Sequence, residues 1–187
     1  LVGSEMCIRD SAMTGTKLCL LDRDGVLNTD TDYLYQIKDV RWIPGSKEAV
    51  ALLNRAGYRV VVVTNQSGVA RGYFTEEDVK KLHVWMGEEI KKAGGEITSF
   101  YYCPHLPGAL LQEYDRECEC RKPKPGMVKR ALQEQQVLPE NAFLIGDNPR
   151  DVEAAKRAGV KGYLFTGGNL AEFVRRILAG QIRPAGI

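Results

Sequence analysis

The sequence predicts an α/β fold in which a parallel sheet carries helices on both faces. Short apolar runs alternate along the chain with amphipathic stretches of helical length, which is the order of consecutive strand–helix units. Most of these apolar runs end at a polar cluster, and ligands of such sheets bind outside the carboxyl ends of the strands. We therefore expect a Rossmann-like sheet whose functional groups share one edge.

The expected elements follow one another in a regular order. Strands are expected at residues 17–21, 59–63, 97–102, 142–145 and 162–165. Helices are expected at residues 46–56, 75–93, 125–136, 150–158 and 169–179. Thr75 and Asp78 have the spacing of a helix-capping pair, and glycines that follow several helices favour left-handed stops. The last helix has apolar residues at helical spacing, so it is expected to pack on the core.

The composition is that of an ordinary globular domain. The chain has 187 residues, of which 44% are hydrophobic and 27% charged, and its formal net charge is +2. This charge is too small to favour nucleic acid or a membrane surface as a partner, and no apolar stretch approaches the ~18 residues of a membrane-spanning helix. We expect a monomer with one domain at 13–187. Residues 1–12 lack periodicity and are expected to be a non-native or disordered leader.

Two aspartates follow the first expected strand. Asp22 and Asp24 are two positions apart, so both carboxylates can face one side, and Gly25 lets the backbone turn away. Two such anions require a cation or a shared proton, and Mg²⁺ suits one or two carboxylates together with a substrate phosphate. An aspartate can act as a covalent nucleophile while a second carboxylic acid protonates the leaving group. Taken alone, the pair is also explained by a solvated polar turn.

Three further clusters favour phosphate chemistry. Thr64 ends the second strand, where a hydroxyl and the adjacent amides could hold a phosphoryl oxygen. Lys122 could offset phosphoryl charge, and Arg121 could grip a second oxyanion. Asp147 follows the fourth strand and would be a third metal carboxylate, with Asp151 supporting it from one helical turn further on. Each cluster alone is also consistent with an ordinary turn, a solvated basic segment or a helix cap.

Four metal-ligating side chains lie close together in the sequence. Cys103, His105, Cys118 and Cys120 supply three thiolates and one imidazole, a closed tetrahedral set suited to structural Zn²⁺. Zinc would order the loop 103–120 and position the basic residues that follow it. The alternative is two unrelated pairs of reduced side chains. No secretory signal accompanies the cysteines, so we expect a reduced, cytoplasmic compartment.

The clusters, in this order, resemble the haloacid dehalogenase superfamily of phosphotransferases over residues 17–168. In this resemblance Asp22 matches the nucleophile and Mg²⁺ ligand, and Asp24 matches the general acid/base, which binds the metal through its carbonyl. Thr64 and Lys122 match the groups that steady the phosphoryl oxygens, and Asp147 matches the last metal ligand. No domain-sized insertion separates the clusters, so no separate cap domain is expected.

The stretches 65–72, 101–105 and 120–127 narrow the resemblance to the heptose bisphosphate phosphatases, within the histidinol-phosphatase-like subfamily. This resemblance implies removal of the C7 phosphate of D-glycero-D-manno-heptose 1,7-bisphosphate through an aspartyl-phosphate, in nucleotide-activated heptose and lipopolysaccharide core biosynthesis. It implies substrate contacts at Asp30, Thr31, Asp32, Tyr33, Asn65, Gln66, Ser67, Arg121 and Asn148.

Two other functions stay open at this point. The histidinol-phosphate phosphatases resemble this chain in the zinc loop. The run through Ala70-Arg71-Gly72 and the ending Pro125-Gly126-Met127 favour the heptose enzymes. A non-catalytic, zinc-stabilised binding module is the third interpretation, and the intact set of aspartates and lysine argues against it. His83 lies in the middle of an expected helix and is assigned a structural role.

Overall fold

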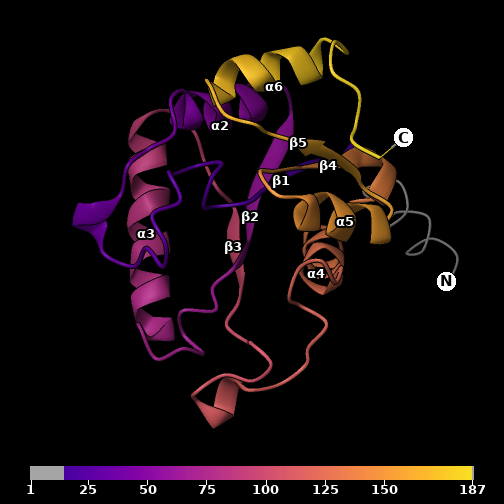
Figure 1. The fold of residues 1–187 in the computed structure, drawn as a ribbon. Helices are drawn as coiled ribbons and strands as arrows, with labels where there is room; N and C mark the ends of the chain where they lie inside the picture. Colours follow the sequence, from indigo (N-terminus) through magenta and orange to yellow (C-terminus); the bar gives the residue numbers. More distant parts are fainter. Residues whose placement is uncertain (1–14, 187) are drawn as a thin grey trace, which may run out of the picture.

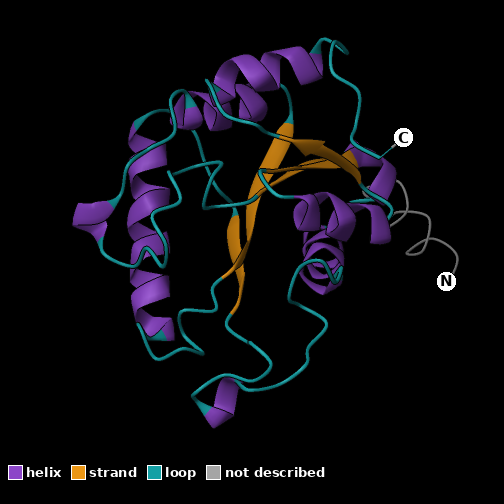
Figure 2. Ribbon diagram, viewed as in Figure 1, coloured by secondary structure: helices purple, strands orange, loops and turns teal. Residues whose placement is uncertain are grey.

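The computed structural model describes residues 15–186. The predicted leader at 1–12 lies outside the described residues and stays a prediction. The centre of the molecule is a parallel five-stranded sheet in the order β3-β2-β1-β4-β5 (Figures 1 and 2). This arrangement confirms the predicted α/β fold class.

The observed elements have the predicted type and order. The strands are β1 (Lys17–Leu21), β2 (Tyr58–Asn65), β3 (Ser99–Cys103), β4 (Ala142–Gly146) and β5 (Lys161–Leu164). The helices are α2 (Ser46–Arg55), α3 (Glu76–Lys92), α4 (Gly126–Gln135), α5 (Pro149–Arg157) and α6 (Leu170–Leu178), with 3-10 turns η1 (Ile37–Asp39), η2 (Gln112–Tyr114) and η3 (Pro139–Asn141). One difference concerns the site. Thr64 and Asn65 were expected after the strand but still belong to β2, where they pair with Tyr102 and Cys103.

Both faces of the sheet are buried, as the alternation of side chains along each strand requires. Cys19 and Leu21 of β1 pack with α2, α3 and α6, whereas Leu18 and Leu20 pack on the opposite face with α4 and α5. Figure 1 shows the two groups of helices on either side of the strands. Burial on both faces explains why the strands read as continuous apolar runs.

Two local predictions are confirmed. Thr75 and Asp78 form a reciprocal capping box at the start of α3, and α6 lies along α2 with its apolar face buried (Figure 1). Over the carboxyl end of the sheet, the described chain contributes only loops and the turns η1 and η2, so the fold has no separate cap domain between its described elements. Among residues 15–186, no helix combines the length and apolar character that a membrane crossing needs.

Candidate active site

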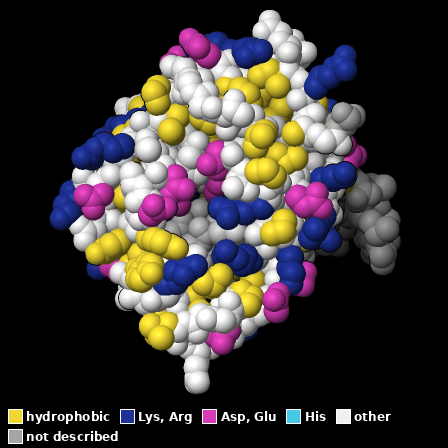
Figure 3. Space-filling view, viewed as in Figure 1, with side chains coloured by type: hydrophobic (Ala, Val, Ile, Leu, Met, Phe, Trp, Pro, Cys, Tyr) yellow, Lys and Arg dark blue, Asp and Glu magenta, His cyan; other side chains and the backbone are white. Residues whose placement is uncertain are grey.

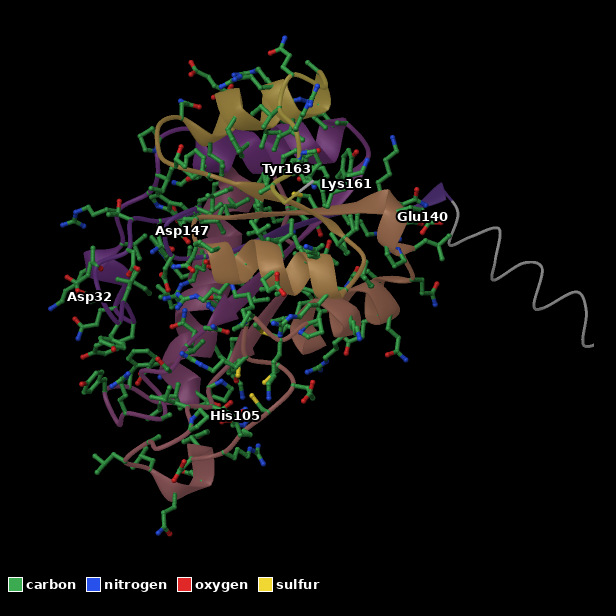
Figure 4. The ribbon with its side chains drawn as sticks, turned by 45° about the vertical axis from the view of Figure 1, so that its right-hand side comes forward. Asp32, His105, Glu140, Asp147, Lys161 and Tyr163 are labelled. Carbon is green, nitrogen blue, oxygen red and sulfur yellow. The ribbon has the colours of Figure 1, made fainter. Side chains whose placement is uncertain are left out.

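A cavity of about 330 Å³ lies at the carboxyl end of the sheet. Its walls are formed by Asp22, Asp24, Asp30, Asp32, Tyr33, Thr64, Asn65, Gln66, Ser67, Gly68, Arg71, Arg121, Lys122, Asp147, Asn148 and Arg150. Of the residues predicted for this site, two are absent from these walls, the substrate contact Thr31 and the supporting residue Asp151. Asp147 and Asp32 lie at the end of the sheet opposite Glu140 and Lys161 (Figure 4). Acidic and basic side chains meet near the middle of the face shown in Figure 3.

Asp22 is the first residue after β1. Its N–H donates to the carbonyl of Ile145 at 3.0 Å, which continues the pairing of β1 with β4 and fixes the backbone. The carboxylate is almost fully buried, and its Oδ1 accepts a hydrogen bond from the Arg23 N–H at 2.8 Å. The same oxygen lies 3.0 Å from Nζ of Lys122. The sheet therefore holds this carboxylate beside a cation 100 positions later in the chain.

The Lys122 side chain is 2% exposed and is held at both ends. Its Nζ donates to the carbonyl of Val63 at 2.8 Å and lies 2.7 Å from Oδ1 of Asp151. The side-chain amide of Asn65 bonds the Lys122 backbone twice, to its carbonyl at 3.1 Å and from its N–H at 3.0 Å. The Asn65 amide thus fixes the lysine, and the predicted contact of Asn65 with substrate stays a prediction.

The charges in this part of the cavity are unbalanced. Burial raises the pKa of Asp22 to about 7; the Lys122 ammonium opposes the rise, and the nearby carboxylates of Asp151 and Asp24 add to it. Burial, with a further contribution from Asp151, also raises the pKa of Asp147. Burial alone would lower the pKa of Lys122, but Asp22 and Asp151 raise it, so the ammonium stays charged. One cation faces several carboxylates, and the site therefore favours a second cation.

Three of these carboxylates could hold a metal ion. Oxygens of Asp22, Asp147 and Asp151 all lie within 4.8 Å of one another, which suits a hard divalent ion with oxygen ligands. Gly25 has φ +86°, and a Cβ at this position would overlap the Asp147 carboxylate. The glycine thus gives Asp147 the room to join the group, and the donor set fits Mg²⁺.

The Asp24 side chain has a different set of partners from Asp22. Gln66 donates through Nε2 to Asp24 Oδ2 at 3.0 Å and to the Thr64 hydroxyl at 2.9 Å. The Gln66 amide is buried and connects the expected acid with the expected phosphoryl-binding hydroxyl. The predicted contact of Gln66 with substrate stays a prediction. Asp24 and Thr64 are thereby fixed relative to each other across the cavity wall.

The outer wall includes groups that the sequence interpretation missed. Arg71 lies over the ring of Tyr33, with its guanidinium carbon 5.6 Å from the ring centroid. Arg150 also reaches this wall, where the side chain of Asn148 accepts a hydrogen bond from the Arg150 N–H at 3.1 Å and caps α5. The signal for Arg71 was present, because it belongs to the stretch 65–72 that carried the resemblance. With Arg121, these residues place three guanidiniums around the opening.

The segment 30–33 reaches the cavity through a tight turn. The Asp32 N–H donates to Asp30 Oδ1 at 3.2 Å. Asp32 and Tyr33 have φ values of 52° and 59°, in the left-handed region that non-glycine residues seldom adopt. Such a backbone turns the Tyr33 ring against Tyr73, with 4.9 Å between the ring centroids.

The four predicted zinc ligands lie together, with Cys103 at the end of β3 and the other three in the loop that follows it. The Sγ atom of Cys103 lies 3.5 Å from that of Cys118 and 2.9 Å from that of Cys120. His105 directs Nδ1 toward the sulfurs, 3.4 Å from Cys120 Sγ, and Figure 4 shows sulfur atoms gathered next to it. Sulfurs around a tetrahedral ion with ~2.3 Å bonds lie ~3.8 Å apart, so a small expansion would admit a metal.

The loop is also attached to α3. The hydroxyl of Tyr114 donates to Glu76 Oε2 at 2.9 Å, and the hydroxyl of Tyr102 donates to Glu76 Oε1 at 2.7 Å. Glu76 is the first residue of α3. One carboxylate thus ties the loop, β3 and α3 together beside the Cys/His cluster.

Comparisons with known proteins agree with this geometry. Models described as haloacid dehalogenase-like hydrolase and HAD-hydrolase-like match residues 19–99 and 119–185. The D-glycero-beta-D-manno-heptose-1,7-bisphosphate 7-phosphatase of Rhodopseudomonas palustris is 44% identical over 165 residues, covering 88% of this chain and 92% of the relative. The chain belongs to the heptose bisphosphate phosphatase family. This membership confirms the predicted superfamily and the predicted class, a phosphoric monoester hydrolase.

Two other members of the heptose bisphosphate phosphatase family inform the substrate and the fold. The D-glycero-alpha-D-manno-heptose-1,7-bisphosphate 7-phosphatase of Photorhabdus laumondii is 35% identical over 144 residues, covering 77% of this chain and 79% of that relative. The crystal structure of D,D-heptose 1,7-bisphosphate phosphatase from B. bronchiseptica, complexed with magnesium and phosphate, has a TM-score of 0.74 and 37% identity, covering 91% of this chain and 90% of the other.

Proposed function

We propose that the chain is a magnesium-dependent phosphatase that removes the C7 phosphate of D-glycero-β-D-manno-heptose 1,7-bisphosphate, in the supply of nucleotide-activated heptose for lipopolysaccharide. The buried contact between Asp22 Oδ1 and Lys122 Nζ, 3.0 Å apart, carries this proposal. It joins a carboxylate nucleophile to a fixed cation, as phosphoryl transfer requires. The 44% identical β-named relative, against 35% for the α-named one, supports the β anomer.

The two aspartates divide the chemistry. An oxygen of Asp22 attacks the C7 phosphorus, and the bond from phosphorus to the sugar oxygen breaks. The Asp24 carboxyl group gives its proton to that oxygen, so the sugar leaves as an alcohol and Asp22 carries the phosphoryl group. Water then attacks phosphorus while the Asp24 carboxylate takes a proton from it. The bond from phosphorus to Asp22 breaks, which releases phosphate and restores both side chains.

Other residues bind and orient the reacting group. The carboxylates of Asp22 and Asp147 and the carbonyl of Asp24 would hold Mg²⁺, which when bound offsets charge on the carboxylates and on the phosphoryl group. Asp151, whose Oδ1 pairs with Lys122, would support this group from behind. Lys122 and the Thr64 hydroxyl steady the phosphoryl oxygens. Arg121 is half-buried at the opening, where its fork suits the second phosphate of a bisphosphate.

We further propose that the Cys/His cluster binds zinc in a structural role. The four ligands leave no open position on a tetrahedral ion, so the ion would take no part in the reaction. Arg121 and Lys122 directly follow the last ligand, Cys120. Zinc would therefore act on catalysis only by fixing the start of the segment that carries these two cations.

A side-by-side assay tests the substrate. Phosphate release is measured with Mg²⁺ on the β and α anomers of heptose 1,7-bisphosphate and on histidinol phosphate. We expect kcat/KM to be about 10-fold or more higher for the β anomer than for the others, a difference that contacts to sugar hydroxyls can supply. An equal value for the α anomer or a higher value for histidinol phosphate would overturn the substrate assignment. If none of these phosphate monoesters releases phosphate, the proposed phosphatase activity would be wrong.

A second measurement tests the proposed role of Arg121. Arg121→Ala should raise KM for the 1,7-bisphosphate but not for heptose 7-phosphate, which lacks the C1 phosphate. Lys124→Ala is the matched control, because Lys124 is a nearby cation that lies outside the cavity wall. An equal rise in KM for both sugars would place the C1 phosphate elsewhere.

A further inference from the structure

The Arg23 side chain, which lies between the two catalytic aspartates in the sequence, is completely buried. A guanidinium keeps its charge in proteins and seldom enters an interior unless its donors are satisfied. Removing this charge from water is unfavourable before any partner is counted. A residue kept in this position at such a cost calls for an explanation from its contacts.

The principal partner of Arg23 is the carboxylate of Asp24. The guanidinium forks onto both oxygens, with Nε 3.0 Å from Oδ1 and Nη2 3.1 Å from Oδ2. Asn28 adds a donor to Oδ1 at 3.0 Å, and Gln66 adds a donor to Oδ2 at 3.0 Å. Four hydrogen bonds from three residues therefore determine where the ionised carboxylate lies. When Asp24 carries the proton, one of the two amide donors gives way to it, while the guanidinium keeps the group in place.

The guanidinium is itself anchored from behind by α3. Its Nη1 lies 3.1 Å from Nε2 of His83, and its Nη2 donates to the carbonyl of Leu34 at 3.0 Å. Arginine offers no acceptor, so Nε2 of His83 accepts and the imidazole proton lies on Nδ1. The His83 ring stacks on Phe100 with 4.6 Å between ring centroids, which fixes its plane. Burial and the neighbouring Arg23 lower the pKa of His83, in keeping with a neutral acceptor.

We propose that Arg23 and His83 are positioning residues that set the location of the Asp24 carboxyl group for proton transfer. The inference rests on the proposed function, because it assigns Asp24 the acid and base steps. A proton donor works only within hydrogen-bond reach of the leaving oxygen. A displacement of the proton donor by about 1 Å can lower the rate about 100-fold. The Arg23 guanidinium, held by His83, would prevent such a displacement of the Asp24 carboxyl group.

Two substrates with different leaving groups distinguish a positioning role of Arg23 and His83 from a merely structural role. A nitrophenolate leaves readily without protonation, whereas a sugar alkoxide needs the proton from Asp24. Loss of positioning should therefore lower kcat/KM for the sugar phosphate and spare that for 4-nitrophenyl phosphate, since kcat/KM reports the steps through leaving-group departure. Damage to the fold, to Asp22 or to metal binding would lower both values together.

The experiment measures kcat/KM on both substrates for Arg23→Lys, His83→Leu and His83→Gln, with Asp24→Asn as the reference for a lost acid. We expect Arg23→Lys to lower the sugar phosphate value roughly 10- to 100-fold and the nitrophenyl value less than about 3-fold. His83→Leu should show the same pattern more weakly, and His83→Gln, which retains an acceptor, should recover most of the loss. Arg59→Lys, which changes a guanidinium at the amino end of β2 bonded to Gln135, is the control.

Each outcome has a defined meaning. Equal losses on both substrates in folded Arg23→Lys, or unchanged values on both, would overturn the positioning role. If Arg23→Lys fails to fold, the comparison of His83→Leu with His83→Gln tests the positioning role. Equal kcat/KM values of these two variants on the sugar phosphate would overturn that role. Failure of the proposed function looks different, because the unaltered enzyme would then release no phosphate or Asp24→Asn would show no dependence on the leaving group.

Discussion

Nζ of Lys122 lies 3.0 Å from Oδ1 of Asp22, and both side chains are almost fully removed from solvent. Lys122→Met should lower the free energy of unfolding by about 3–5 kcal/mol, because it leaves buried carboxylates without their cation. Lys124→Met is the matched control. Lys124 pairs with Glu117 at 3.1 Å near the surface, where solvent screens the pair, so its loss should change stability much less. Urea unfolding measures both, and equal effects would contradict the expectation.

Asp22→Asn should abolish turnover while the fold and the Cys/His metal content persist. We expect kcat to fall about 10³-fold or more, since the amide cannot form the phosphoryl-enzyme. Acid quench with labelled substrate measures the phosphoryl-enzyme directly, and circular dichroism checks the fold. A variant that still forms labelled protein or keeps substantial activity would show that another residue is the nucleophile.

Gly25→Ala should lower the affinity for Mg²⁺, whereas the control Gly57→Ala should not. An added Cβ would meet the Asp147 carboxylate and would also strain a backbone with positive φ. Gly57→Ala is the control, since Gly57 has φ +89° with open space around the added atom, and should cost only the strain of about 1–2 kcal/mol. Activity titrated with Mg²⁺ should show roughly 10-fold weaker affinity for Gly25→Ala alone. Equal Mg²⁺ affinities in the two variants would mean that Asp147 is not a metal ligand.

Cys118→Ser should remove the metal from the loop and lower kcat/KM without touching the reacting groups. The physical reason is that the ligands of the cluster fix the start of the segment that carries Arg121 and Lys122. Cys19→Ala is the control, because Cys19 is buried in β1 outside the cluster. Elemental mass spectrometry should find about one zinc per chain in the control and less in the variant. Unchanged kcat and KM in zinc-free protein would end the idea that zinc supports catalysis.

His83 should make stability depend on pH below about 6.5. Its pKa in the folded protein lies well below the ordinary value because of burial and Arg23, so below about pH 6.5 the unfolded chain binds a proton that the folded chain does not. Stability from this group is then present at higher pH and lost as the pH falls, by up to about 1.4 kcal/mol per pH unit. Urea unfolding between pH 5 and 8 should show a smaller slope for His83→Gln. An unchanged slope would mean that His83 is protonated in the fold.

The sequence was informative where chemistry follows from local pattern. The positions of the apolar runs in the sequence placed Asp22, Thr64 and Asp147 at the ends of predicted strands. The carboxyl ends of parallel strands meet at one edge of the sheet. The capping pair Thr75 and Asp78 was likewise a local signal. These predictions needed only neighbours in the chain.

The sequence was uninformative where long side chains reach distant partners. Arg23 bonds Gln66 and His83, which lie 43 and 60 positions away, and Asn65 bonds the Lys122 backbone 57 positions away. Periodicity assigns a side chain to a face but does not say which acceptor its end will reach. Asn65 and Gln66 were therefore predicted only as substrate contacts, and the hydrogen bonds of their amides to Lys122, Asp24 and Thr64 were not foreseen.

The Cys/His cluster gathers both ends of the loop 103–120 at one point, next to the cation that faces Asp22. The residues between His105 and Cys118 consequently form a loop whose two ends both lie at the Cys/His cluster. None of these residues lines the active-site cavity, so insertions or deletions between His105 and Cys118 should leave Lys122 and the reacting groups in place.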